Sequence, residues 1–73
     1  MTARALAEAA LAAAFGWTPT DVAEEAEAIG EDVDGWAAAE WVDFMASHAG
    51  DVDPEDAAAY DQAIKAIEAG ATA

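Results

Sequence analysis

The sequence predicts an all-α protein, a compact four-helix bundle of two αα-hairpins in a single domain, residues 1–73. Four stretches carry apolar residues at the three- and four-residue spacing of one helix face. Thr18-Pro19 and Asp53-Pro54 are each typical of a helix start, because a capping side chain precedes a proline at the first helical position. The abundant alanine favours helix and lets helices approach closely. The expected helices cover about residues 3–15, 19–29, 35–49 and 54–69.

The first expected helix, about 3–15, carries Leu11 and Phe15 four residues apart on one face. Thr2 is suited to cap its start, and Gly16 is suited to end it in a left-handed turn. The surface of this helix is nearly uncharged. We therefore expect it to be buried on more than one side or to be used in self-association, which leaves a homodimer open.

The second expected helix begins at Pro19. Thr18 as its cap places Asp21 at the third helical position, a variant of the capping box. Trp17 and Val22 occupy the two positions of a hydrophobic staple. We expect this helix to bury one apolar face and to turn its glutamates to water; the buried face consists of Val22, Ala26 and Ile29, and the glutamates are Glu24, Glu25 and Glu27.

The third expected helix is the most aromatic segment and is predicted to be the core helix. Asp34 is expected to cap its start, and Gly50 to end it in a left-handed turn. Its predicted inner face consists of Ala37, Trp41, Phe44, Met45 and His48.

The fourth expected helix starts at Pro54, with Asp53 as its cap and Asp56 at the third position. Residues 15–21 and 49–56 therefore resemble two copies of one helical corner. Internal duplication and shared turn chemistry both explain this match. The expected apolar face consists of Ala57, Tyr60, Ile64 and Ile67.

Charge is the most unusual property of the sequence. Sixteen acidic residues accompany two basic ones, Arg4 and Lys65, and the formal net charge is −14. Such acidity is common in disordered chains, but 56% of the residues are hydrophobic and three are tryptophan, which indicates a folded protein. Direct nucleic-acid binding is excluded, because phosphates would meet a surface of the same sign.

Nothing in the sequence predicts catalysis, and we expect a protein without catalytic residues or cofactors. There is no cysteine, glycine-rich phosphate loop or dinucleotide fingerprint. Ser47 is the only serine and directly precedes His48, the only histidine, but adjacent helical residues point in different directions.

No metal site is expected either. Asp32 to Gly35 resembles part of an EF-hand, but Gly30 and Trp41 would then occupy the first and last ligand positions. His48 with Asp51 and Asp53 lacks the paired histidines of zinc sites. We interpret His48 as a residue that packs at the end of its helix and favours the dipole there.

No run of the sequence approaches the roughly 18 apolar residues of a membrane span. The amino end does not resemble a signal peptide either, since it carries Arg4 and Glu8 and lacks a leucine-rich centre. We expect a cytoplasmic protein without membrane contact.

The acidic residues have three interpretations: a solvated surface, adaptation to high salt, or a surface that imitates a nucleic-acid backbone. Helical carboxylates three or four residues apart lie roughly 5–6 Å from each other, comparable with phosphates along one strand. Trp36 is interpreted either as a cover for the loop before the third helix or as an aromatic anchor within an acidic rim. The candidate partner-binding residues are Asp21, Glu24, Glu25, Glu27, Glu31, Asp32, Asp34 and Trp36.

In size, acidity and predicted helicity the chain resembles the DNA-mimic inhibitors of phages and mobile elements, of the anti-restriction and anti-CRISPR kind. The resemblance is one of composition over the whole chain, and no sequence motif supports it. It implies a non-enzymatic protein that blocks the basic nucleic-acid-binding surface of a partner, in a host cytoplasm if a phage encodes it. The alternative is a phage or actinobacterial structural or assembly adaptor that binds a partner helix through the Ala/Leu-rich first helix.

Overall fold

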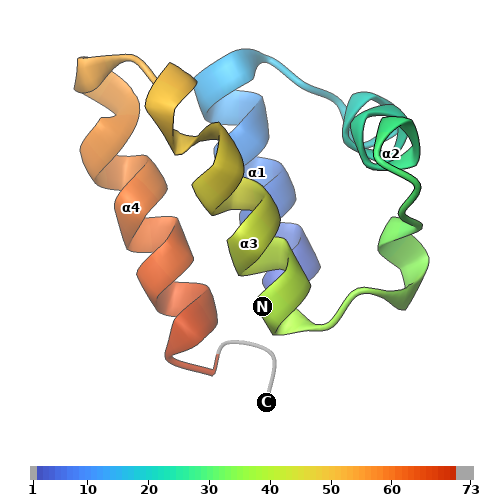
Figure 1. Cartoon of the computed structure of the whole chain (residues 1–73). Coiled ribbons are helices and arrows are strands. Elements are labelled where there is room, and N and C mark those ends of the chain that lie inside the picture. Colours follow the sequence, from blue (N-terminus) through green and yellow to red (C-terminus); the bar gives the residue numbers. More distant parts are fainter. Residues whose placement is uncertain (1, 71–73) are drawn as a thin grey trace.

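The computed structural model describes residues 2–70 and contains four α-helices and two short 3₁₀ turns (Figure 1). No strand occurs in this part of the chain. The predicted all-α fold of four helices is therefore confirmed. In chain order the elements are α1 Ala3–Phe15, α2 Pro19–Ala28, η1 Val33–Gly35, α3 Ala38–His48, η2 Ala49–Asp51 and α4 Pro54–Glu68.

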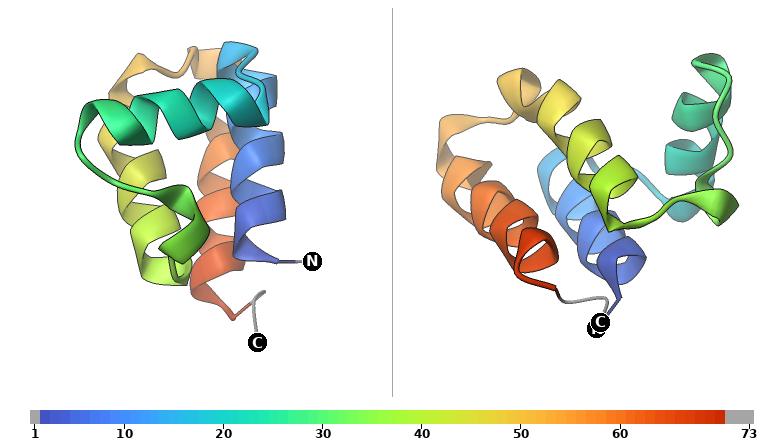
Figure 2. Two further views of the ribbon diagram at one scale, coloured as in Figure 1. Left: turned by 90° about the vertical axis from the view of Figure 1, so that its right-hand side faces the viewer. Right: turned by 60° about the horizontal axis from the view of Figure 1, so that its bottom comes forward.

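Three of the helices lie side by side, and the fourth crosses them. α1 makes its largest contact with α4, and α3 packs against both. α2 lies across this group and contacts α1 over a smaller area (Figure 2). α1 is thus the central helix, which explains its uncharged surface.

The start of α2 follows the prediction closely. The Thr18 hydroxyl accepts a hydrogen bond from the Asp21 N–H at 3.2 Å, and the Asp21 carboxylate accepts one from the Thr18 N–H at 2.9 Å. The ends of α1 also agree with the prediction: Thr2 caps the start, and Gly16 ends the helix at φ 73°. These signals are local, because each capping group lies within three residues of its partner.

α3 begins at Ala38, and the predicted cap at Asp34 is wrong. The Asp32 carboxylate accepts a hydrogen bond from the Asp34 N–H at 3.0 Å, which stabilises the 3₁₀ turn instead. The chain is then extended at Trp36, and the Glu40 carboxylate accepts from the Ala37 N–H at the true helix start. Because α3 begins after Ala37, that residue is exposed and does not belong to the core.

The two helical corners are built differently. Gly50 lies in the 3₁₀ turn η2 and has no positive φ, so the predicted left-handed turn at this residue is wrong. Asp53 occupies the cap position of α4, but its carboxylate accepts no capping hydrogen bond. The Asp56 N–H bonds to the backbone carbonyl of Asp53 at 2.9 Å instead.

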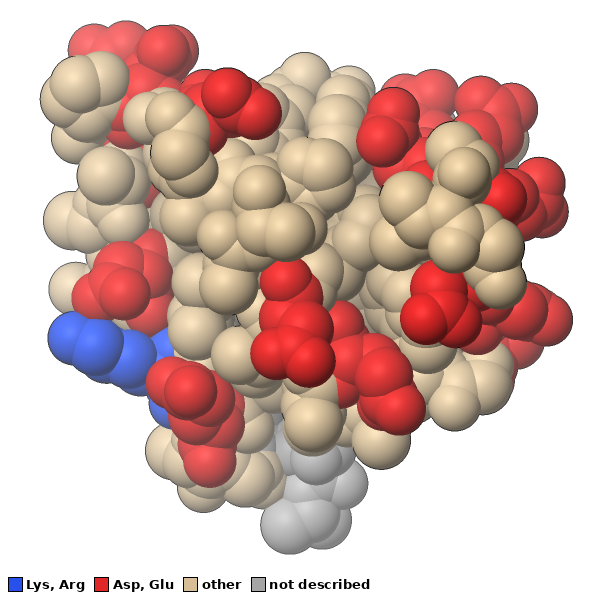
Figure 3. Space-filling model, viewed as in Figure 1, with Lys and Arg blue, Asp and Glu red and all other residues tan. Residues whose placement is uncertain are grey.

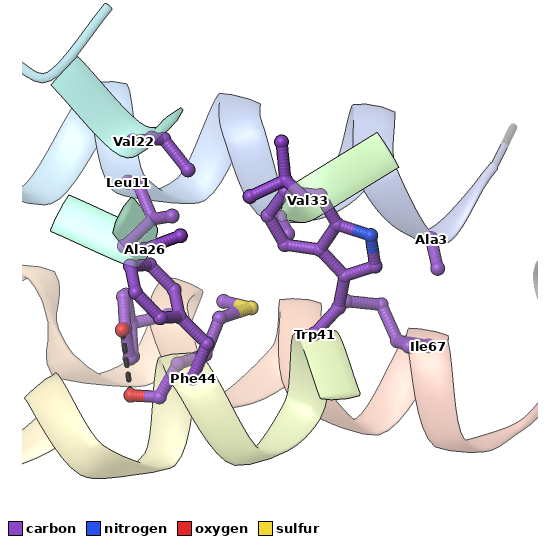
Figure 4. Packing of buried hydrophobic residues seen from close by; sticks show 11 residues of the cluster. Ala3, Leu11, Val22, Ala26, Val33, Trp41, Phe44 and Ile67 are labelled. Atoms are coloured by element: carbon purple, nitrogen blue, oxygen red, sulfur yellow. Dashed lines mark hydrogen bonds between the residues drawn. The ribbon is translucent and has the colours of Figure 1, made fainter. Parts of the chain in front are cut away.

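The core is small and apolar throughout, and no polar or charged residue of the described chain is buried. Trp41, Phe44 and Met45 of the predicted α3 face are buried, as are Tyr60 and Ile67 of α4. The complete set is Ala3, Ala7, Leu11, Val22, Ala26, Val33, Trp41, Phe44, Met45, Tyr60 and Ile67 (Figure 4).

Besides Ala37, two residues of the predicted inner faces are exposed. Ile29 is 68% exposed, because it caps the end of α2 where the chain turns away from the bundle. Ala57 lies in the first turn of α4 and is also exposed. Both predictions are wrong for the same reason: helical spacing describes a face, but packing need not extend to the helix ends.

Tyr60 joins α4 to the end of α3. Its hydroxyl donates a 2.7 Å hydrogen bond to the Met45 carbonyl, drawn as the dashed line in Figure 4. Met45 is in the last turn of α3, where carbonyls lack helical N–H partners. Burial raises the pKa of the Tyr60 hydroxyl from 10.0 to about 12.

We expect Trp41→Ala to lower the free energy of unfolding by about 3–5 kcal/mol, because it removes the largest buried side chain. Thermal or urea unfolding followed by circular dichroism measures this change. Ala39→Ser, at an exposed position of the same helix, is the control and should unfold like the wild type. A Trp41→Ala protein that melts within a few degrees of the wild type would contradict the assigned core.

We expect Tyr60→Phe to cost about 0.5–1.5 kcal/mol, since it removes the hydrogen bond to Met45 but keeps the ring. The folded state favours the neutral Tyr60 hydroxyl. Its contribution to the free energy of unfolding is therefore complete below pH 10 and is lost as the pH rises through about 12. Unfolding of the wild type and of Tyr60→Phe at a series of alkaline pH values checks this. Equal pH dependence of the two proteins would show that Tyr60 is not the group responsible.

Candidate functional site

The exposed glutamates of α2 lie as the sequence predicts. Glu24, Glu25 and Glu27 are exposed, while Val22 and Ala26 face the core. Figure 3 shows acidic side chains gathered over α2 and further groups over α3 and α4. The α2 glutamates form an outward face without any basic side chain.

Three further carboxylates of the predicted row have partners within the protein. Asp21 is half-buried in the capping box of α2, and Asp32 accepts the hydrogen bond that stabilises η1. Asp34 forms an ion pair with Arg4 at 2.9 Å. These three carboxylates already have contacts within the fold, so they are less suited to binding a partner than the free glutamates of α2.

Glu31 is held next to the end of α2 by a Schellman motif. Its N–H bonds to the Ala26 carbonyl at 2.9 Å, and the Gly30 N–H bonds to the Glu27 carbonyl at 3.0 Å. Gly30 adopts φ 80°, the left-handed conformation that this motif requires. The exposed Glu31 side chain therefore projects from a well-defined backbone turn.

The basic side chains neutralise few of the acids. Arg4 pairs with Glu8 at 3.2 Å and with Asp34, and Lys65 pairs with Asp61 at 3.0 Å. Hydrogen bonds to these carboxylates raise the pKa of both basic groups above their ordinary values. In residues 2–70, which contain all sixteen acids, thirteen have no basic side chain within ion-pairing distance.

Trp36 is half-buried and covers the core. Its ring meets the edge of Trp41 at a centroid distance of 4.9 Å and is tilted against Phe44 at 5.2 Å. The indole Nε1 is buried and has no hydrogen-bond partner, so ring packing alone fixes its position. This arrangement agrees with the first interpretation of Trp36, a cover for the loop before α3.

An open hollow of about 260 Å³ lies beside Trp36, between the end of α2 and one side of α3. We call it the α2–α3 hollow. Its lining combines three large apolar side chains with three carboxylates and one hydroxyl: Ile29, Trp36 and Phe44; Glu31, Glu40 and Asp43; and Ser47. Of these residues the sequence predicts only Glu31 and Trp36 to bind a partner. Sequence patterns do not identify the other lining residues, because only the tertiary structure places residues 29–31 beside α3.

The residues considered for catalysis are not arranged for it. His48 packs against Phe44 and Trp17 at centroid distances of 4.8 and 5.2 Å, as expected of a packing residue. The Ser47 hydroxyl donates to the Phe44 carbonyl at 2.7 Å. The two side chains thus have separate structural partners.

One acidic group at the start of α4 has the spacing of metal ligands. The carboxylates of Asp53, Glu55 and Asp56 lie within 4.8 Å of one another. This group differs from the trio considered from the sequence, because His48 and Asp51 do not join Asp53 in it. Acidic side chains at a helix N-terminus are favoured by the helix dipole alone, so this group does not by itself indicate a metal.

Neither a scan against protein-family models nor searches of curated proteins and of solved structures give a match to this chain. Within the described residues, no helix combines the length and the apolar content that a membrane span requires. The chemistry of the surface is therefore the guide to function.

The unpaired acids should make stability depend on salt. A net charge of −14 on a body with a radius of gyration of 11.2 Å favours expansion, so added salt should raise the melting temperature up to about 0.5 M. Thermal melts in sodium chloride measure this. A melting temperature that is constant or falls would show that the charges are locally compensated, and would weaken the interpretation of the acids as an adaptation to high salt.

Proposed function

We propose that the protein is a non-enzymatic acidic module that binds the basic nucleic-acid-binding surface of a partner protein and blocks it, as DNA-mimic inhibitors do. The observation that carries this proposal is the outward face of α2, where Glu24, Glu25 and Glu27 are exposed and have no basic neighbour. A basic groove supplies the counter-charge that this chain lacks.

Spacing supports the same proposal. Glu24 and Glu27 are three residues apart on one helix, and Asp21 and Glu25 are four apart, so their Cβ atoms lie about 5–6 Å from each other. Carboxylates at this distance present a row of negative charge comparable with that of a phosphate backbone. The row is also rigid, because a capping box starts α2 and a Schellman motif ends it.

The chemistry of the other candidates supports a binding role over a catalytic one. The one histidine lies in an aromatic cluster, and the one serine bonds to backbone. No carboxylate of the described residues is buried, so none has the desolvated environment that tunes a general acid. A protein of this kind acts through contact.

The adaptor alternative has less support. It requires apolar side chains of α1 to face a partner, but Leu11, Ala3 and Ala7 of this helix are buried in the core. A partner helix or a second copy would meet mainly small exposed alanines on α1, namely Ala9, Ala12 and Ala13. Because Leu11 is buried, Leu11→Asp is expected to destabilise the core.

We expect charge reversal of the α2 face, Glu24→Lys with Glu25→Lys and Glu27→Lys, to abolish partner binding and to leave the fold intact. Each exposed change should alter the free energy of unfolding by about 0.5 kcal/mol or less. The immobilised protein should capture nucleic-acid-binding proteins from a bacterial lysate at low salt, and both duplex DNA and high salt should release them.

The control is the triple variant Asp51→Lys, Asp61→Lys and Glu68→Lys, which has the same net charge but changes exposed residues of η2 and α4. It should retain capture. The proposal fails if the α2 variant folds and captures the same proteins as the wild type, or if duplex DNA releases none of them.

A further inference from the structure

The α2–α3 hollow has one feature that the α2 face lacks: its floor is apolar. Ile29 is 68% exposed and is the only large hydrophobic residue of the described chain that is so exposed. It lies beside Trp36 and Phe44 in the lining of the hollow. Apolar atoms left in water at a concave site favour an occupant that covers them.

The two walls of the hollow are held in place. The Schellman motif fixes the backbone of Ile29 and Glu31, with Gly30 between them in the left-handed conformation. On the other wall, the Glu40 carboxylate accepts a hydrogen bond from the Ala37 N–H, which ties it to the start of α3. The packing of Trp36 on Trp41 and Phe44 fixes the floor. An occupant therefore meets a preformed site.

The rim has only negative charge. Glu31, Glu40 and Asp43 line the hollow, and neither Arg4 nor Lys65 lies within ion-pairing distance of any of them. Carboxylates gathered at one site repel each other, and a cation placed among them relieves that repulsion. The Ser47 hydroxyl already donates to backbone, so its remaining capacity is as an acceptor. Apart from the Trp36 indole N–H, which is buried, the free side-chain polar groups of the lining therefore accept hydrogen bonds.

An apolar floor with an acceptor-only rim matches an arginine side chain. The arginine stem is apolar, and its planar guanidinium carries five N–H donors that pair with carboxylates and stack on aromatic rings. Lysine supplies the charge without the planar fork. A purely apolar anchor would cover the floor but would bring the carboxylates close to a group that cannot pair with them.

We propose that the α2–α3 hollow binds an arginine side chain of a partner protein, with the stem on Ile29, Trp36 and Phe44 and the guanidinium among Glu31, Glu40 and Asp43. This inference rests on the proposed function in one respect, that the partner is a basic protein. It adds a residue-specific contact to the diffuse attraction of the α2 face.

The test is a titration of the whole protein with a short capped peptide, acetyl-Gly-Ala-Arg-Leu-Gly-amide, followed by NMR of the Trp36 indole N–H. Matched peptides replace the arginine with citrulline, which is neutral and nearly the same shape, or with lysine. The arginine peptide should bind about tenfold more tightly than the citrulline peptide, and about threefold more tightly than the lysine peptide. Equal binding of arginine and citrulline would overturn the inference.

Two protein variants locate the site. Asp43→Asn and Ile29→Ser change exposed residues of the hollow and should each weaken the arginine peptide about three- to tenfold. Asp51→Asn removes the same one negative charge as Asp43→Asn, but lies outside the hollow and outside the α2 face, and should leave affinity nearly unchanged. If Asp51→Asn weakens binding as much as Asp43→Asn, the attraction is general and the inference fails.

The peptide experiment can fail independently of the proposed function. Suppose that the α2 triple variant no longer captures proteins that duplex DNA releases, and that the arginine and citrulline peptides bind equally. The proposed function then stands, and the arginine site is rejected. Suppose instead that the wild type binds the arginine peptide selectively, and that the α2 triple variant captures the same proteins as the wild type. The arginine site then stands, and the α2 face is rejected as the mimic surface.

Discussion

The packing of Trp41 is the interaction on which the rest of the structure depends. Its side chain is 1% exposed and lies among buried residues of α1, η1 and α4 (Figure 4). Trp36 meets it edge-on, so the connection between α2 and α3 is anchored on the same ring. The packing of one buried indole therefore determines the position of α3, the course of η1 and the floor of the α2–α3 hollow.

Apolar packing has to hold this protein together with little help from charge. The described residues bury no polar or charged side chain, and the ion pairs of Arg4 and Lys65 are exposed or partly exposed. Exposed pairs of this kind contribute little to stability. The consequence is a division of roles: alanine, leucine, isoleucine and aromatic side chains make most of the fold, and most of the acids remain free for solvent or for a partner.

Sequence analysis predicts the features that depend on near neighbours. The Thr18–Asp21 capping box and the Gly16 turn each involve groups a few residues apart, so pattern alone identifies them. The start of α3 is mispredicted because Asp32, and not Asp34, supplies the capping carboxylate, and it starts the 3₁₀ turn η1 before the helix. The α2–α3 hollow is beyond prediction from pattern because it joins Ile29 to Phe44, which only tertiary packing brings together.

The short connection after α2 forms part of one wall of the hollow. α2 is attached to the core by Val22 and Ala26, and the chain is attached again at Val33. Only residues 30–32 lie between the end of the hollow's Ile29 wall and that second attachment. This segment carries the Schellman motif and the Asp32 cap of η1, so inserting or deleting a residue there would move Glu31 relative to α3. The shape of the hollow therefore depends on the length of this segment as well as on the side chains that line it.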